Sequence, residues 1–111
     1  MKKFLLFTLV GLLGFASVKA QVTTSSLSGT ILDSKGEELI GASVKATHQP
    51  TGSSYGASSN TQGKFSIPNM RVGGPYLITV SYIGFQSRSY SGVMLKLGEP
   101  YVLNVVLDDS G

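Results

Sequence analysis

The chain has 111 residues, of which 41% are hydrophobic and 14% are charged, and it contains no cysteine. The lack of cysteine excludes a disulfide scaffold, a thiolate metal site, a cysteine nucleophile and lipid attachment at a lipobox. Three of the nine basic residues precede residue 21, and the six that remain balance six acidic residues, so no excess positive charge supports a nucleic-acid partner.

The first 20 residues have the pattern of a cleavable signal peptide. A pair of lysines opens the chain, and the apolar stretch over residues 4–16 follows it. This stretch is shorter than the roughly 20 residues that a membrane-spanning helix needs. A V-x-A pattern ends at Ala20. We therefore predict cleavage between Ala20 and Gln21 and export of the remaining chain.

Beyond residue 20 no apolar stripe recurs at helical spacing, and alternation of apolar with polar residues predicts an all-β domain. We expect residues 21–26 to form a polar leader and residues 108–111 a polar tail, both outside the core. Between them, residues 27–107 contain about seven short runs bounded by Gly, Pro, Asn or Asp, as is typical of a β-sandwich. The predicted strands lie around residues 27–31, 42–46, 55–59, 65–67, 76–82, 85–90 and 101–107.

Two runs are predicted to form the centre of the core because their alternation is strongest. The first two strands show a weaker alternation, which predicts that every second side chain of these strands also points into the core. The expected inward residues are Leu27, Gly29 and Ile31, then Ala42, Val44 and Ala46, then Tyr76, Ile78, Val80 and Tyr82, and finally Tyr101, Leu103, Val105 and Leu107.

A possible catalytic motif occurs at residues 52–56, which read G-x-S-x-G around Ser54. This pattern marks the nucleophile of α/β-hydrolases only at a strand-to-helix turn with histidine and acid partners. Here it lies in a Ser/Gly-rich part of a short β domain, and His48 is the sole histidine. We interpret the motif as a loop that enters a strand, and we expect no enzymatic activity.

Metal binding has two candidate locations, and both have a simpler explanation. His48 has no nearby Cys, Asp or Glu to complete a site of three or four ligands, so we expect it to be a strand-end residue. Asp33, Glu37 and Glu38 lie around Gly36. Calcium requires about six to eight oxygen ligands, and a hairpin turn accounts for these residues instead. We expect no metal and no cofactor.

Tyrosine rings are the remaining candidates for ligand contacts, since exposed aromatic rings stack on sugars. Tyr82 and Tyr101 belong to the predicted core faces. Tyr55 and Tyr90 are therefore the only expected stacking platform, and their arrangement distinguishes a carbohydrate-binding domain from a domain that contacts other proteins. If they lie exposed and side by side, the domain is a stand-alone carbohydrate-binding module.

Five segments carry a resemblance to a known family. They are residues 27–33 (LSGTILD), 39–44 (LIGASV), 60–67 (NTQGKFSI), 72–76 (VGGPY) and 80–85 (VSYIGF). In this order they resemble the carboxypeptidase regulatory-like domain, in the version found at the N-terminus of Oar-like TonB-dependent outer-membrane receptors. The resemblance covers nearly all of residues 27–107. It implies a seven-stranded Greek-key sandwich, prealbumin-like and also described as carbohydrate-binding-like.

The resemblance also implies a function, which the turn glycines and core residues do not specify by themselves: a non-catalytic accessory domain of a receptor that contributes to substrate uptake through protein contacts. In such receptors the domain precedes a TonB box, a plug and a membrane barrel. We expect the chain to be a receptor's N-terminal fragment or a stand-alone copy, at the periplasmic face of the outer membrane. Its expected partners are envelope proteins, either the receptor's own plug and barrel or periplasmic uptake components. Membrane contact is expected only through a downstream barrel, and the lack of a His-x-x-Glu motif carries over no peptidase activity.

Overall fold

The computed structural model describes residues 23–110, so the predicted signal peptide and its cleavage site lie outside the described residues. Within this range every regular element is a strand. No helix in the described part of the chain is long and apolar enough to cross a membrane. The strands are β1 (Thr24–Asp33), β2 (Ser43–His48), β3 (Ser53–Ser58), β4 (Lys64–Arg71), β5 (Gly73–Ser81), β6 (Arg88–Leu95), β7 (Tyr101–Val102) and β8 (Val105–Leu107).

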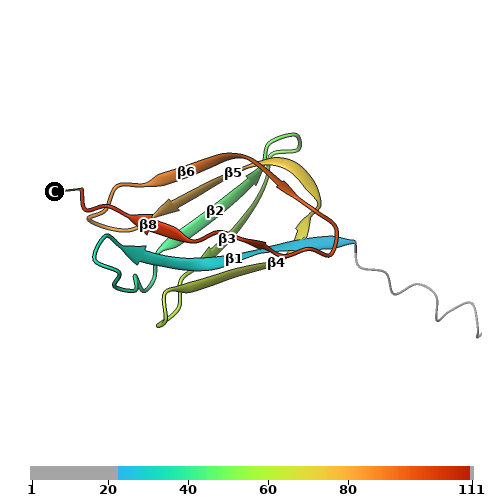
Figure 1. The fold of residues 1–111 in the computed structure, drawn as a ribbon. Coiled ribbons are helices and arrows are strands. Elements are labelled where there is room, and N and C mark those ends of the chain that lie inside the picture. The colour runs from blue at the N-terminus through green and yellow to red at the C-terminus, as the bar shows by residue number, and fades with distance from the viewer. Residues whose placement is uncertain (1–22, 111) are drawn as a thin grey trace, which may run out of the picture.

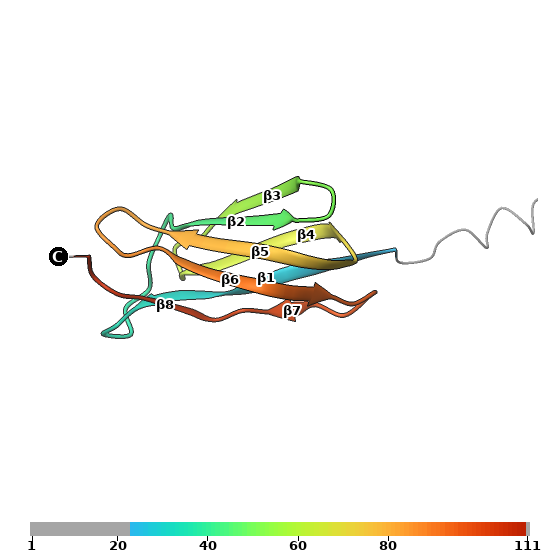
Figure 2. The same ribbon diagram turned by 90° about the horizontal axis from the view of Figure 1, so that it is seen from above.

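The strands form two packed sheets (Figures 1 and 2). One sheet has the order β4-β1-β7, with β8 also pairing β1, and the other has the order β3-β2-β5-β6. The chain passes from one sheet to the other after β1, β3, β4 and β6. The first strand pairs in parallel with the last two, while the remaining pairs are antiparallel. The predicted all-β sandwich is confirmed.

The inward face of the second sheet follows the predicted alternation. Ala46 lies opposite Ile78, and Val44 lies opposite Val80, in an unbroken antiparallel register. All four side chains are at most 1% exposed. Because alternate residues of a strand point to opposite faces, this register places one continuous apolar layer against the other sheet. From the other sheet, Leu27, Ile31, Phe65, Ile67, Met70, Val105 and Leu107 complete the core.

The predicted polar leader is wrong at its C-terminal half. β1 begins at Thr24, and Ser25 is buried and donates a hydrogen bond of 2.7 Å to the carbonyl oxygen of Glu99. A serine is tolerated here because its hydroxyl finds a partner. At the other end, Asp108 and Ser110 are exposed, as expected of a polar tail, but both bond to the turn after β5.

The predicted strand around residues 85–90 lies too early in the chain. Phe85 closes the turn after β5 and forms an isolated bridge with Asp109, and β6 runs from Arg88 to Leu95 with Val93 buried. The β5–β6 register shifts twice, and Gly92 has a φ of 71°. This bulge interrupts the alternation between Tyr90 and Val93, so the second half of β6 has no regular two-residue pattern in the sequence.

The predicted strand over residues 101–107 is divided into β7 and β8. Between them, the N–H of Leu103 donates to Ser28 O at 2.7 Å, and the Asn104 side chain, not a backbone carbonyl, accepts from Thr30 N at 3.3 Å. Leu103 runs so close to Gly29 that a Cβ on that glycine would overlap the Leu103 carbonyl oxygen. The interruption raises the strand count from the predicted seven to eight.

Three side chains expected in the core are only half-buried, namely those of Tyr82, Tyr101 and Leu103. Each lies at or beside the end of a strand, where the opposing sheet covers one side of the residue. They pack against the core without forming its centre.

Candidate functional site

The serine of the G-x-S-x-G motif lies on the outer face of the edge strand β3. Ser54 is exposed and pairs with Thr47 of β2. His48 is buried on the inner face, so the sheet separates the two side chains. A serine nucleophile needs a base within hydrogen-bond reach, which this arrangement does not provide.

His48 is the last residue of β2, as the sequence predicts, and the hairpin holds its ring in place. Its Nδ1 lies 2.7 Å from Thr51 Oγ1, and its ring packs edge-on against Tyr76 at 5.1 Å. No group of three or more His, Asp or Glu side chains in the described part of the chain could hold a metal ion. The contacts of His48 are those of a packed structural residue.

Asp33 forms a turn and does not gather ligands. Its Oδ1 accepts hydrogen bonds from the backbone N–H groups of Lys35 at 2.9 Å and Glu37 at 2.8 Å. Glu37 and Glu38 are both exposed. An aspartate that bonds the backbone two residues on is a common turn device, and it explains the acidic cluster.

Tyr55 and Tyr90 lie at opposite edges of one sheet. Tyr55 pairs with Ala46, Ala46 with Ile78, and Ile78 with Tyr90, so the four residues form one row across β3, β2, β5 and β6. Three interstrand spacings of about 4.8 Å put roughly 14 Å between the backbones of the outer two. Both rings are half-buried against the core. The structure does not bring them together.

Tyr55 instead joins an aromatic cluster with Tyr76 and His48. The Tyr55 and Tyr76 rings lie 6.2 Å apart. The Tyr76 hydroxyl donates to Arg71 O at 2.6 Å, and Arg71 N donates to the Tyr55 hydroxyl at 3.2 Å. Burial, with a smaller contribution from Tyr55, raises the pKa of Tyr76 to about 12. This cluster ties the β2–β3 hairpin to the β4–β5 turn.

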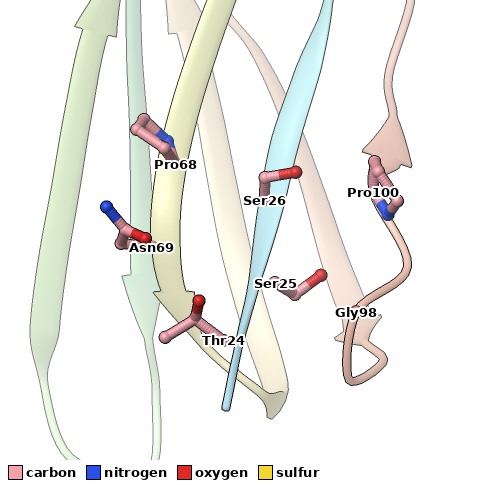
Figure 3. A pocket seen from close by; sticks show the side chains of 7 residues that line it. All are labelled: Thr24, Ser25, Ser26, Pro68, Asn69, Gly98 and Pro100. Carbon is pink, nitrogen blue, oxygen red and sulfur yellow. The ribbon is translucent and has the colours of Figure 1, made fainter. Parts of the chain in front are cut away.

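The described part of the chain has small hollows on its surface. One hollow, of about 210 Å³, is lined by residues of β1, β4 and the loop before β7, among them Ser25, Asn69 and Pro100, whose side chains Figure 3 shows. A second, of about 340 Å³, is lined by Gly41, Ser43 and residues 81–83. The first hollow is smaller than the usual range of about 300 to 1,000 Å³ for ligand pockets and the second is near the lower limit, and both are open to solvent, so they favour shallow contact over deep ligand binding.

Among the described residues, the most exposed large apolar side chain is that of Ile83, which is 95% exposed. It lies in the turn between β5 and β6, residues 82–86, which we call the tip. Within the tip, Phe85 N donates to Tyr82 O, and the two rings lie 5.6 Å apart. Gly41, next to the exposed Ile40, lines the same hollow as Ile83.

The C-terminal segment holds the tip in place. Gln86 N donates to Asp108 O at 2.8 Å, and Gly84 O accepts from both the backbone N–H and the hydroxyl of Ser110. Figure 1 shows the C-terminal end beside the β5–β6 connection. Ile83 is therefore presented on a braced turn. The sequence analysis assigned Tyr82 to the core and gave Ile83 no role, so it missed this feature.

Comparison with known sequences identifies one family. The sequence profile of the carboxypeptidase regulatory-like domain matches residues 26–108. No curated protein sequence matches the chain.

Solved structures share the fold at low sequence identity. A type II cohesin–X-dockerin complex from Acetivibrio cellulolyticus has 16% identity and a TM-score of 0.60, over 75% of this chain and 56% of that one. Catechol 1,2 dioxygenase from Acinetobacter radioresistens has 15% identity and a TM-score of 0.60, over 81% and 53%. A proposed carbohydrate binding protein from Bacteroides uniformis has 19% identity and a TM-score of 0.57, over 76% and 41%. This chain spans about half or less of those chains, and the likeness is one of fold.

Proposed function

We propose, since the chain belongs to the carboxypeptidase regulatory-like domain family, that it is a non-catalytic accessory domain that acts through contacts with other proteins. In finer terms, it is the N-terminal domain of a TonB-dependent outer-membrane receptor. It faces the periplasm and contributes to substrate uptake by contacting the receptor's plug and barrel or periplasmic uptake components.

The observation that carries this proposal is the braced, exposed tip. An isoleucine that is 95% exposed gains nothing from the fold, whereas burial against a partner would stabilise the complex by about 1.5 to 3 kcal/mol. Because hydrogen bonds to Asp108 and Ser110 already order the turn, a partner would lose little entropy in ordering it further.

The receptor context rests on the resemblance of residues 72–76 and 80–85 to the Oar-like version of the domain and on the signal-peptide pattern. The same segment, residues 80–85, contains Ile83 and most of the tip. In a receptor of this kind the plug follows the sandwich. Residues 108–110 lie against the tip, so a following plug would begin beside Ile83.

The separation of Tyr55 from Tyr90 disfavours the alternative, a stand-alone carbohydrate-binding module. Sugar stacking uses adjacent exposed rings, and these two are half-buried at opposite edges. The Bacteroides uniformis protein supports this alternative only through its fold. The dioxygenase likewise contributes no chemistry here, because the described residues provide no base beside Ser54 and no metal cluster.

Site-directed photocrosslinking tests the proposal. A photoreactive residue at Ile83, in cells that express the whole gene, should crosslink to the receptor's plug or to a periplasmic uptake protein. The matched control is Val102 of β7, which is 64% exposed and away from the tip. Crosslinks from position 102 only, or from neither position, would contradict the proposal.

A further inference from the structure

The two sheets have four edges, and three of them carry features that block pairing with another strand. β4 contains Pro68, which lacks an N–H, followed by Asn69 with a φ of 57°. The β7/β8 edge is interrupted at Asn104, whose side chain replaces a backbone acceptor. Edge strands with prolines, bulges or breaks are protected against intermolecular pairing.

β6 is protected in a different way. Gly92 introduces a bulge, and the guanidinium of Arg88 donates to Val106 O at 3.0 Å, which ties β6 to β8 of the other sheet. A charged residue and a bulge on one edge strand both oppose the addition of another strand.

β3 has none of these features. Its six residues, Ser53–Ser58, include no proline and no charge, and they pair with β2 without any register shift. Figure 2 shows β3 as the outermost strand of its sheet among the described residues. It is therefore the edge open to a further strand.

The backbone groups of β3 that face outward can be assigned from the register. Ser59 N donates to Ala42 O, so Ser59 is directed toward the neighbouring segment. Because N–H and C=O directions alternate along an antiparallel strand, Ser54, Gly56 and Ser58 direct theirs away from β2. In the described part of the chain β3 pairs with no strand other than β2, so these groups face no neighbouring strand.

The sequence around this edge is self-complementary. Serines lie at equal distances on either side of Gly56, and Tyr55 and Ala57 flank it on the inner face. We propose that β3 pairs antiparallel with β3 of a second copy of this chain, about a two-fold axis through Gly56. This inference goes beyond the proposed function and does not depend on it.

The geometry of that pair fits both faces of the strand. Gly56 opposes its own copy, and Ser54 opposes Ser58 of the second copy, in hydrogen-bonded pairs formed by the outward backbone groups. Tyr55 then opposes the small Ala57 of the second copy in a non-hydrogen-bonded pair, where side chains lie closest. A large ring beside a methyl group fills the half-exposed inner edge. The two-fold axis makes each contact occur twice.

Sedimentation velocity on the full chain as purified tests the pairing. Intact-mass measurement identifies the N-terminus of the purified protein, since cleavage after Ala20 is predicted. The interface is a single strand pair, smaller than about 1,000 Å², so a weak dimer is expected that forms between about 1 µM and 1 mM. In the Ser54→Lys/Ser58→Lys variant, lysines of the two copies oppose each other at two places, so the dissociation constant of the dimer should rise about tenfold. A wild-type chain that stays monomeric at about 1 mM would overturn the proposal.

Two matched variants separate pairing from total charge. Ser54→Lys/Ser58→Glu opposes unlike charges across the same axis and should dimerise at least as well as wild type. Ser34→Lys/Ser91→Lys adds the same charge as the double-lysine variant at two exposed positions, one in the turn after β1 and one on β6 at the opposite edge of the sheet, and should also dimerise as wild type does. A double-lysine variant that dimerises as well as these two would overturn the proposal.

Hydrogen exchange on the wild-type chain gives a readout that does not depend on the folding of a variant. Dimer formation should slow exchange at the amides of Ser54, Gly56 and Ser58. Those of Tyr55 and Ala57, already directed toward β2, should change little. Protection that is absent from these three amides at dimer concentrations would show that the copies meet elsewhere and would overturn the proposal.

Discussion

The hydroxyl of Tyr76 donates a hydrogen bond of 2.6 Å to the backbone carbonyl of Arg71, five residues earlier in the chain. The Tyr76 ring is fully buried, and its pKa is raised to about 12 from the ordinary value of 10.0, chiefly by burial. The neutral phenol is thus part of the folded structure, because its proton makes the bond that closes the β4–β5 turn.

This bond predicts a loss of stability in alkali. The unfolded chain releases the Tyr76 proton near pH 10, whereas the folded chain keeps it to about pH 12. The contribution is therefore complete below pH 10 and is lost as the pH rises from 10 to 12, with a slope of up to about 1.4 kcal/mol per pH unit. Urea denaturation across this range measures the slope.

Tyr76→Phe is the control for that slope. It removes one hydrogen bond, which costs about 1 kcal/mol at neutral pH, and it removes this titration. The other tyrosines are present in both proteins, so their effect on the slope cancels in the comparison. If the variant and the wild type lose stability equally between pH 10 and pH 12, Tyr76 does not titrate as described.

Gly29→Ala should destabilise the sandwich strongly. The added methyl would overlap the carbonyl oxygen of Leu103, and the backbone there is fixed by the bond from Leu103 N to Ser28 O. Overpacking of this kind costs about 1 to 3 kcal/mol or more. Gly56→Ala is the control, since its methyl would meet only Val44 O at 3.6 Å. Equal thermal stability of the two variants would show that the close approach at Gly29 is absent in solution.

Core truncations should follow the observed burial, not the predicted faces. Ile78→Ala removes a fully buried side chain and should cost about 2 to 5 kcal/mol. Tyr82→Ala removes a half-buried ring and should cost less, while Ser54→Ala, on the outer face, should cost almost nothing. Thermal melts give the order directly. A larger loss for Ser54→Ala than for Ile78→Ala would contradict both the face assignment and the dismissal of the G-x-S-x-G motif.

The fold was largely predictable from the sequence where local pattern and tertiary packing agree. Alternation around Val44 and Ile78 predicted that these residues point inward. In the structure β2 and β5 pair with each other, and both residues are buried in the core. The turn at Asp33 was likewise predictable, because an aspartate's bonds to the backbone of nearby residues are local.

The parts that depend on distant contacts were not predictable. The break between β7 and β8 depends on Leu103 passing over Gly29, and the burial of Ser25 depends on Glu99. Neither partner is close in sequence. The candidate site was missed for the same reason, since the exposure and bracing of Ile83 follow from the path of the C-terminal segment.

Export remains a prediction from the N-terminal sequence. The lysine pair, the apolar stretch and the V-x-A pattern predict cleavage between Ala20 and Gln21. Intact-mass measurement on the periplasmic product should show a chain that begins at Gln21. A product that keeps the first 20 residues would refute the prediction.

Uptake by the full-length receptor, measured with and without residues 27–107 and alongside glycan-array binding of the purified chain, tests the accessory-domain proposal most directly. The proposal predicts that the deletion impairs uptake while the barrel stays folded in the outer membrane. It also predicts that the chain binds no glycan, because the rings of Tyr55 and Tyr90 are half-buried and far apart and the partner surface is the apolar tip. Normal uptake after the deletion, together with specific glycan binding, would contradict the proposal and favour a carbohydrate-binding module.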